Sequence, residues 1–285
     1  AEFRARAYHH ARPILTCPGV AQPISAVQLA LTTQEVAKQR RIDEVYGDSK
    51  DPWLAFLDAQ EVSSRLGLEA DSALLFRDSA IINLPGLCAQ LLAHPRIQFV
   101  QSAGPEQPDV IACASMSQRF APAVPLEIGD VFGQLEWIAP PVSDNLKKLN
   151  VAIVGNGYVL PGTEHWVIGS TYEQSPWEAD IATAHNIASN RAFLGADDIQ
   201  TLKYQRAARC VSSDRDPVIG KVDEYVWITA AHGSMGSSSA PFAASIIASD
   251  MLGWIAPASS RALKSVAPDR FIARQARRGV RKVGA

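Results

Sequence analysis

The sequence predicts a mixed α/β (α+β) protein in which the segments of two lobes are interleaved along the chain. With 285 residues, 47% of them hydrophobic and 20% charged, the chain suits one large domain or two intertwined ones. Short apolar runs with strand character alternate irregularly with runs of helical periodicity. No internal repeat or low-complexity linker divides them, and this mixed order is typical of α/β or α+β folds.

The first half of the chain contains five recognisable segments. Residues 17–31 read as extended chain interrupted by prolines, and 32–47 read as a polar helix with a Thr start and a Gly stop. Residues 58–68 predict a short helix. Residues 83–95, "NLPGLCAQLLAHP", predict a helix that buries its leucines, and 108–115 predict a short buried strand.

The second half opens with three extended segments rich in β-branched and aromatic residues, at 132–140, 150–162 and 165–173. A helix is predicted over 175–195, ending at Gly195. Residues 206–220 read as extended chain with a turn at the Asp-Pro pair.

The stretch "AAHGSMGSSSAP", Ala230–Pro241, lies between a strand-like run and a helix-like run. Its glycines, Gly233 and Gly236, would let the backbone approach a flat ligand. The predicted helix has an N-cap among Ser237, Ser238 and Ser239, Pro241 in its first turn, an apolar face of Phe242, Ile246 and Ile247, and an end at Gly253. Such an N-terminus would attract negative charge, although a capped helix after a glycine turn has the same pattern.

A second glycine pair, Gly155 and Gly157, also follows a strand. A dinucleotide-binding turn would place a third glycine at position 160 and continue as a helix, but Leu160 and Pro161 stand there. We therefore expect a strand with a tight turn, and no phosphate site.

Composition narrows the function classes. No apolar run is long enough to span a bilayer, and we expect a cytoplasmic protein. Cys17, Cys88, Cys113 and Cys210 lack zinc or disulfide spacing, so we expect reduced core thiols and no metal.

Charge is concentrated at the C-terminus. From Arg261 onward there are eight Lys/Arg and one Asp, or +7, which leaves −9 for the rest of the chain. A basic tail suggests contact with a polyanion, whereas a solvated terminal helix is the alternative. The candidate nucleic-acid-binding residues are Arg274, Arg277, Arg278, Arg281 and Lys282.

Several motifs together resemble a known family. "ARCVSSDRDPVIG", "HGSMGSSSAPFAASIIASDMLG" and "LKSVAPDRF" are similar to the C-terminal end of D-amino-acid-oxidase-like flavoproteins. Within that group the FAD-dependent domain of the bifunctional tRNA-modifying MnmC family also has counterparts of "FGQLEWI", "GNGYVLPG" and "IGSTYE", in the same order.

The resemblance implies a two-lobe fold. An FAD-binding lobe with a parallel sheet would take residues 77–118 and 209–257. A mostly antiparallel substrate lobe would take 17–76 and 119–208, and 258–285 would form the basic tail.

The resemblance also implies chemistry. The implied reaction uses FAD to remove the carboxymethyl group of carboxymethylaminomethyl-uridine at the tRNA wobble position, beside a methyltransferase domain. By position, Arg209 would grip the substrate carboxylate and Tyr158 would orient the substrate. The flavin would meet a loop made of Gly233, Ser234, Met235, Gly236 and Ser237.

The sequence departs from the family at its start, because no N-terminal GxGxxG unit precedes the matched segments, so the parallel sheet is expected to be incomplete. We therefore expect a fragment of a longer protein, whose missing segment would bind the FAD phosphates. Two alternatives stay open: an amino-acid or secondary-amine oxidase of the same fold, and a flavin-free RNA-binding or structural remnant.

Overall fold

A computed structural model describes residues 2–47, 53–102, 104, 106–140, 151–194 and 199–278. The chain divides into two compact units. Unit 1 comprises Ala1–Ile14, Asn83–Val131 and Ala208–Ala285, and unit 2 comprises Leu15–Ile82 and Phe132–Ala207. Each unit is therefore built from segments that are separated along the chain.

The unit boundaries differ from the predicted lobes at two places. Residues 77–82 were predicted in the cofactor lobe, but they complete the unbroken strand β3 (Ser72–Ile82) of unit 2. Residues 119–131 were predicted in the substrate lobe, but Ala121 and Leu126 belong to a hydrophobic core of unit 1.

Unit 2 is built on an eight-stranded sheet with the order β2-β3-β1-β6-β7-β8-β5-β9. β1 pairs in parallel with β6, whereas β1–β3, β2–β3, β6–β7, β7–β8 and β5–β8 pair antiparallel. The remaining strands are β1 (Ala21–Ala30), β2 (Leu54–Asp58), β5 (Ile128–Ile138), β6 (Val151–Val154), β7 (Tyr158–Leu160), β8 (Trp166–Gly169) and β9 (Thr201–Ser212). The mostly antiparallel character of this lobe agrees with the prediction.

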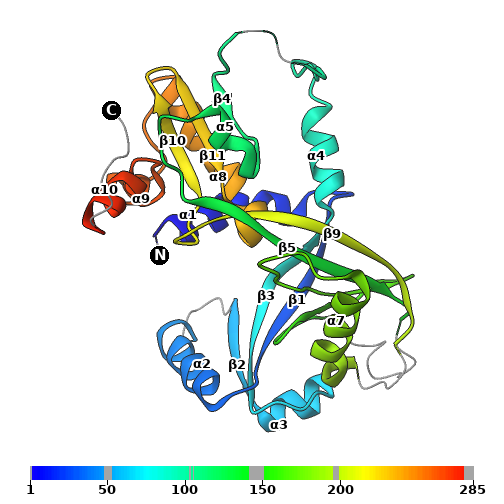
Figure 1. The fold of residues 1–285 in the computed structure, drawn as a ribbon. Coiled ribbons are helices and arrows are strands. Elements are labelled where there is room, and N and C mark those ends of the chain that lie inside the picture. The colour runs from blue at the N-terminus through cyan, green and yellow to red at the C-terminus, as the bar shows by residue number, and fades with distance from the viewer. Residues whose placement is uncertain are drawn as a thin grey trace. The chain divides into compact units, whose positions relative to one another are not determined.

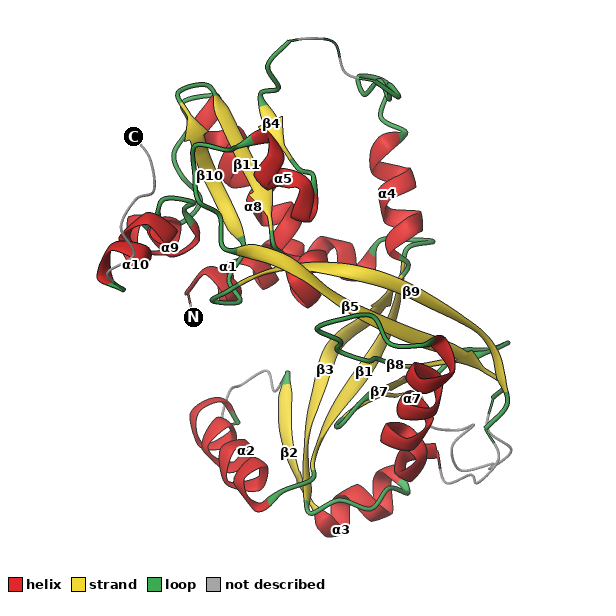
Figure 2. Ribbon diagram, viewed as in Figure 1, coloured by secondary structure: helices red, strands yellow, loops and turns green. Residues whose placement is uncertain are grey.

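One face of this sheet is fully covered. Alternate residues such as Val27, Ile153 and Ile168 are buried in a core with α7 (Ala179–Leu194) and the short helices α3 (Ala59–Glu61) and η2 (Val62–Leu66). Figure 2 shows α7 and α3 as red helices beside the sheet. This cover explains why most of these alternating side chains are apolar, whereas Gln134 and Glu136 of β5 are buried on the same face and hydrogen-bond to Thr183 and Asn186 of α7.

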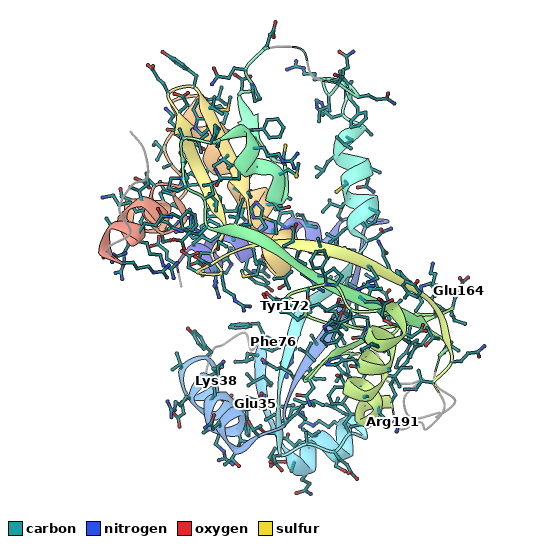
Figure 3. The ribbon with its side chains drawn as sticks, in the orientation of Figure 1. Glu35, Lys38, Phe76, Glu164, Tyr172 and Arg191 are labelled. Carbon is teal, nitrogen blue, oxygen red and sulfur yellow. The ribbon has the colours of Figure 1, made fainter. Side chains whose placement is uncertain are left out.

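The opposite face is only partly covered. Its side chains alternate with the buried ones, and Leu135, Tyr158 and Val167 are half-buried there. Helix α2 (Thr33–Tyr46) packs over β1, β2 and β3, where Gln39 donates a hydrogen bond to Gln28 O at 2.7 Å. Figure 3 labels Phe76 of β3 and Tyr172, which follows β8, in this unit.

Helix α2 begins and ends where the sequence predicts. The Thr32 side chain accepts a hydrogen bond from Glu35 N, and Gly47 is the C-cap. The carboxylate of Glu35 in turn accepts a hydrogen bond from Leu31 N, which, with a bond from Thr32, lowers the pKa of Glu35.

Unit 1 contains a three-stranded sheet with the order β10-β11-β4. β10 (Val218–Asp223) and β11 (Val226–Ala230) pair antiparallel, and β11 pairs in parallel with β4 (Val110–Ile111). Helix α8 (Gly236–Met251) packs on β10 and β11, and α1 (Glu2–Ala11) packs on α8 (Figure 1). The other helices are α4 (Leu84–Leu92), α5 (Ser117–Phe120), α9 (Ser260–Val266), α10 (Arg270–Arg277) and the 3-10 turns η1 (Arg12–Thr16), η3 (Ala114–Met116) and η4 (Gly233–Met235).

Helix α4 forms as predicted, but its leucines are exposed rather than buried. Leu84, Leu91 and Leu92 are 47%, 60% and 53% exposed, and Figure 1 shows α4 extending away from the three-stranded sheet. β4 has only two residues, of which Ile111 is buried and Val110 is exposed. A helix this apolar is ordinarily covered on at least one side.

Other large apolar side chains of unit 1 are exposed as well. These further side chains are Ile97, Phe99, Val100, Met116, Phe120, Met251, Leu252, Trp254 and Ile255. Together with Leu84, Leu91 and Leu92 of α4 and Val110 of β4, we call them the exposed apolar residues of unit 1. Monomeric proteins rarely leave this much apolar area in water without a binding partner.

Candidate functional site

The loop between β11 and α8 has a tightly specified backbone. Ala231 and Gly233 have φ values of +56° and +54°, in the left-handed region. A Cβ on Gly233 would also lie 3.4 Å from Val211 Cγ1, so glycine is favoured there by conformation. The 3-10 turn η4 (Gly233–Met235) then leads directly into α8.

The start of α8 differs from the prediction. The N-cap is Met235 instead of one of the three serines, and Pro241 lies inside the helix rather than in its first turn. Ser238 and Ser239 direct their hydroxyls back to Met235 O, at 3.1 and 2.8 Å. The α8 N-terminus therefore has no side-chain hydrogen bond that caps it.

The remainder of α8 agrees with the prediction. Phe242, Ile246 and Ile247 are buried against unit 1, and Gly253, with φ of +66°, lies just beyond the helix end. A capless N-terminus on a well-packed helix is a fixed, partly positive surface that suits a negatively charged group.

The same loop contains a histidine, His232, that was not among the predicted site residues. His232 Nε2 is 2.8 Å from Thr229 Oγ1, and His232 Nδ1 is 2.8 Å from Ser239 Oγ. Burial lowers the pKa of His232 to about 4, so the ring is neutral at pH 7. In the sequence, His232 is a lone histidine among small residues. That pattern does not distinguish a histidine that holds the loop by hydrogen bonds from an exposed one.

Arg209 is half-buried near the end of β9. Two residues later, Val211 forms an isolated bridge with His232, so within unit 1 strand β9 runs beside the β11–α8 loop. Next to Arg209, burial raises the pKa of Cys210. The structure thus brings Arg209 and the Gly233–Ser237 loop into one region of unit 1.

The turn after β9 is held by an ion pair. Arg270 Nε lies 3.0 Å from Asp214 Oδ2, and Arg270 Nη2 donates to Asp216 O at 2.9 Å. Burial raises the pKa of Asp214, but hydrogen bonds from Arg270 and Ser212 outweigh it and lower the pKa to about 2. This clasp fixes where β9 ends and β10 begins.

Tyr158 lies in unit 2, on the partly covered face of the sheet. It pairs with Gly169 of β8, and a Cβ added at Gly169 would lie 2.9 Å from Tyr158 Oη. The ring therefore crosses the strand where a neighbouring side chain is missing. Asn190, from α7 on the other face, donates to Gly169 O at 3.4 Å.

Tyr158 follows the glycine pair that we excluded as a phosphate site. β6 and β7 form an antiparallel hairpin, closed by a hydrogen bond of 2.8 Å from Gly155 N to Gly157 O. No helix begins there, and the prediction of a strand with a tight turn is confirmed.

The predicted nucleic-acid contacts begin on α10, where two of the arginines already have acidic partners. Arg274 Nη1 lies 3.3 Å from Asp214 Oδ2, and Arg278 Nη1 lies 3.6 Å from Glu127 Oε1. Arg277 is exposed. Arg281 and Lys282 lie outside the described residues.

Membrane spans and metal centres are not found in the described part of the chain. It contains neither a helix capable of crossing a membrane nor a group of His, Cys, Asp and Glu side chains able to hold a metal.

Comparison with solved structures identifies the fold. Glycine oxidase from Geobacillus kaustophilus matches with a TM-score of 0.77 at 15% identity, covering 94% of this chain and 81% of that one. Iminodiacetate oxidase from Chelativorans sp. BNC1 matches with a TM-score of 0.72 at 16% identity, covering 94% and 82%. The chain has the fold of the D-amino-acid-oxidase-like flavoproteins.

Sequence comparison finds similarity to MnmC bifunctional proteins. The MnmC bifunctional protein of Chromobacterium violaceum is 26% identical and covers 92% of this chain, and that of Hahella chejuensis is 24% identical and covers 87%. The chain resembles MnmC proteins over most of its length, but it spans only 49% and 46% of these two relatives. No protein-family model matches it.

Proposed function

We propose that this chain is the oxidase part of a tRNA-modifying flavoprotein. The substrate would be carboxymethylaminomethyl-uridine at the tRNA wobble position. FAD, when bound, supplies a two-electron oxidation of the C–N bond, and water then splits the resulting imine into glyoxylate and aminomethyl-uridine.

One observation carries this proposal more than any other. The MnmC proteins of Chromobacterium violaceum and Ralstonia nicotianae match 92% and 90% of the chain, so the similarity extends through both units. These relatives are named for the biosynthesis of a methylaminomethyl-2-thiouridine in tRNA. A substrate bearing a carboxymethylamino group fits that naming.

The loop at the start of α8 would meet the flavin ring. Backbone N–H donors at the start of this helix, which has no side-chain cap, would face the flavin, and Gly233 would keep side chains out of the approach. Reduced flavin carries negative charge at one edge of the ring, which these donors and the helix dipole would stabilise. The loop residues in this proposal are Gly233, Ser234, Met235, Gly236 and Ser237.

Arg209 would bind the substrate carboxylate. Its planar guanidinium can donate two parallel hydrogen bonds to a carboxylate, which fixes direction as well as position. Within unit 2, the ammonium of Lys203 lies 4.5 Å from the Trp137 ring centroid. Trp137 shares the partly covered sheet face with Tyr158, whose hydroxyl would orient the substrate amine.

The proposal also includes a segment, outside the 285 residues of this chain, that would complete the FAD site. The glycine pair of the β6–β7 hairpin offers no helix start, so we propose that a further segment binds the FAD phosphates. The exposed apolar residues of unit 1 would pack against that segment. In the bifunctional relatives the remaining length would include the methyltransferase.

A second function is supported by different observations. Glycine oxidase and iminodiacetate oxidase share the fold, and both are named for small carboxylated amines. The pairing of Arg274 and Arg278 within unit 1 also weakens the charge argument for RNA. An oxidase of a free secondary amine is therefore the alternative, and a flavin-free RNA-binding remnant is a third.

The decisive assay separates these functions by product. The chain, or a longer form that retains FAD, is incubated with tRNA carrying carboxymethylaminomethyl-uridine, and the nucleosides are analysed by mass spectrometry. Conversion to aminomethyl-uridine with release of glyoxylate supports the proposal. Turnover of iminodiacetate or glycine without change in the tRNA would favour the amine oxidase, and absence of bound flavin would favour the remnant.

A further inference from the structure

The ring of His232 joins the strand before the flavin-facing loop to the helix after it. Nε2 faces Thr229 Oγ1 of β11, and Nδ1 faces Ser239 Oγ of α8, each at 2.8 Å. The loop between these two anchors carries the left-handed residues Ala231 and Gly233. A ring with a partner at both nitrogens is held in one orientation.

The hydrogen bonds determine which nitrogen carries the proton. Ser239 Oγ lies 2.8 Å from Met235 O, and a carbonyl oxygen only accepts, so the Ser239 hydroxyl donates there. Its single hydrogen is then used, and it must accept from Nδ1–H of His232. A neutral ring with its proton on Nδ1 leaves Nε2 to accept from the Thr229 hydroxyl.

This chain of bonds reaches the backbone of the loop. It runs from Thr229 through His232 and Ser239 to the carbonyl of Met235, the N-cap of α8. His232 O also accepts from Met235 N at 3.1 Å, which closes the turn from the other side. A left-handed alanine is held only when its surroundings determine it, and these bonds supply that constraint at Ala231.

We propose that His232 is the positioning residue of the flavin-facing loop. Its neutral Nδ1–H tautomer holds η4 and the start of α8 in the shape that would present this helix start to the flavin. The proposal rests on the proposed function for the identity of the ligand. We call the hydrogen bonds of His232 to Thr229 and Ser239 the brace. The tautomer and the brace are expected in this chain whether or not FAD is present.

The first test needs no cofactor. Long-range 1H–15N NMR of the histidine-labelled chain at pH 7 is expected to show His232 protonated at Nδ1 and unprotonated at Nε2, with His232→Gln used to assign the signal. Protonation at Nε2, at both nitrogens, or fast exchange between tautomers would overturn the brace.

The second test uses variants that keep or break one bond each. Asparagine can place its amide N–H near Nδ1, whereas glutamine reaches toward Nε2. His232→Gln and Ser239→Ala are therefore expected to weaken FAD binding about tenfold by fluorescence titration, and His232→Asn to retain most of it. Equal affinity in all three variants would contradict the proposal.

Two matched controls alter hydrogen bonds in which serines of α8 take part. Ser238→Ala removes a hydroxyl that also donates to Met235 O but does not contact His232. His10→Asn breaks another histidine–serine pair, in which Nε2 of His10 on α1 lies 3.0 Å from Ser245 Oγ of α8. Both controls are expected to bind FAD like the parent chain. If they lose as much affinity as His232→Gln, the effect is general destabilisation and the proposal fails.

The outcomes distinguish the inference from the function. If the parent and a longer form bind no FAD, the proposed function fails, and the NMR measurement still decides the tautomer and the brace. If both bind FAD and His232→Gln binds equally well, the function stands and the brace is wrong.

Discussion

Arg209 makes the sharpest prediction at the scale of a single residue. Arg209→Lys retains the positive charge but loses the two-pronged donor geometry, so turnover is expected to fall by one to three orders of magnitude, about 1–4 kcal/mol in the barrier. Steady-state kinetics and the flavin absorption spectrum measure both consequences. Flavin content should be unchanged, and a parallel loss of flavin and turnover would instead give Arg209 a structural role.

His232 gives a prediction about pH. Its pKa is about 4 in the folded chain against an ordinary value of 6.5, because burial disfavours the charged ring. Below pH 6.5 the unfolded chain binds a proton that the folded chain does not, so the free energy of unfolding should fall toward pH 4, by up to about 3 kcal/mol. Above pH 6.5 this contribution is constant.

Urea unfolding followed at a series of pH values checks this dependence. His232→Gln should remove most of the slope between pH 4 and 6.5, while Ser238→Ala, which removes no titratable group, should keep it. Equal slopes for the parent and the His232 variant would assign the pH dependence to other groups.

At the scale of elements, α10 changes how the basic tail should be tested. Its first residue, Arg270, is clasped by Asp214, and Arg274 also lies beside Asp214, so removing the helix would disturb the β9–β10 turn as well as the tail charge. The informative variant replaces Arg277, Arg281 and Lys282 with alanine and leaves the clasp intact.

If the tail contacts RNA phosphates, this triple variant should bind tRNA more weakly. Its salt dependence should flatten by roughly 0.7 to 0.9 log unit per log unit of salt for each phosphate-binding side chain that is removed. Filter binding across a salt series measures the slope, with Arg278→Ala as the control for an internally paired arginine. Identical slopes for the triple variant and the parent would show that the tail has no part in binding.

The sequence predicted the ends of helices and turns correctly where a single side chain or a single turn determines them. Thr32 and Gly47 delimit α2, and Leu160 and Pro161 correctly exclude a helix after Gly157. The α8 cap was wrong because the loop winds into a 3-10 turn before the serines, a result of His232 contacts that no propensity describes.

Long-range contacts are what the sequence could not predict. Arg274 and Arg278 look like a free basic stripe in the sequence, but Glu127 and Asp214 approach them from segments far away in the chain. The leucines of α4 have the pattern of a buried helix, yet Leu84, Leu91 and Leu92 are exposed among the described residues and only Leu87 is half-buried. The spacing of apolar residues along a helix shows which face is apolar, but it does not show which partner will cover that face.

At the scale of the whole molecule, the exposed apolar residues of unit 1 predict a partner surface. In the 285-residue chain Leu91→Glu is expected to change the free energy of unfolding by less than about 0.5 kcal/mol and to reduce self-association, because Leu91 is 60% exposed. Ile246→Ala on α8 is expected to cost about 2–5 kcal/mol, since Ile246 is buried. Chemical denaturation and light scattering measure both. A drop of several kcal/mol with Leu91→Glu would mean that α4 is already covered.

The most direct measurement is an anaerobic titration of the flavin-loaded protein with tRNA. We predict that tRNA carrying carboxymethylaminomethyl-uridine bleaches the oxidised flavin absorption band in proportion to the tRNA added, and that the same tRNA lacking this modification does not. Bleaching by iminodiacetate or glycine but not by the modified tRNA would contradict a tRNA-modifying oxidase.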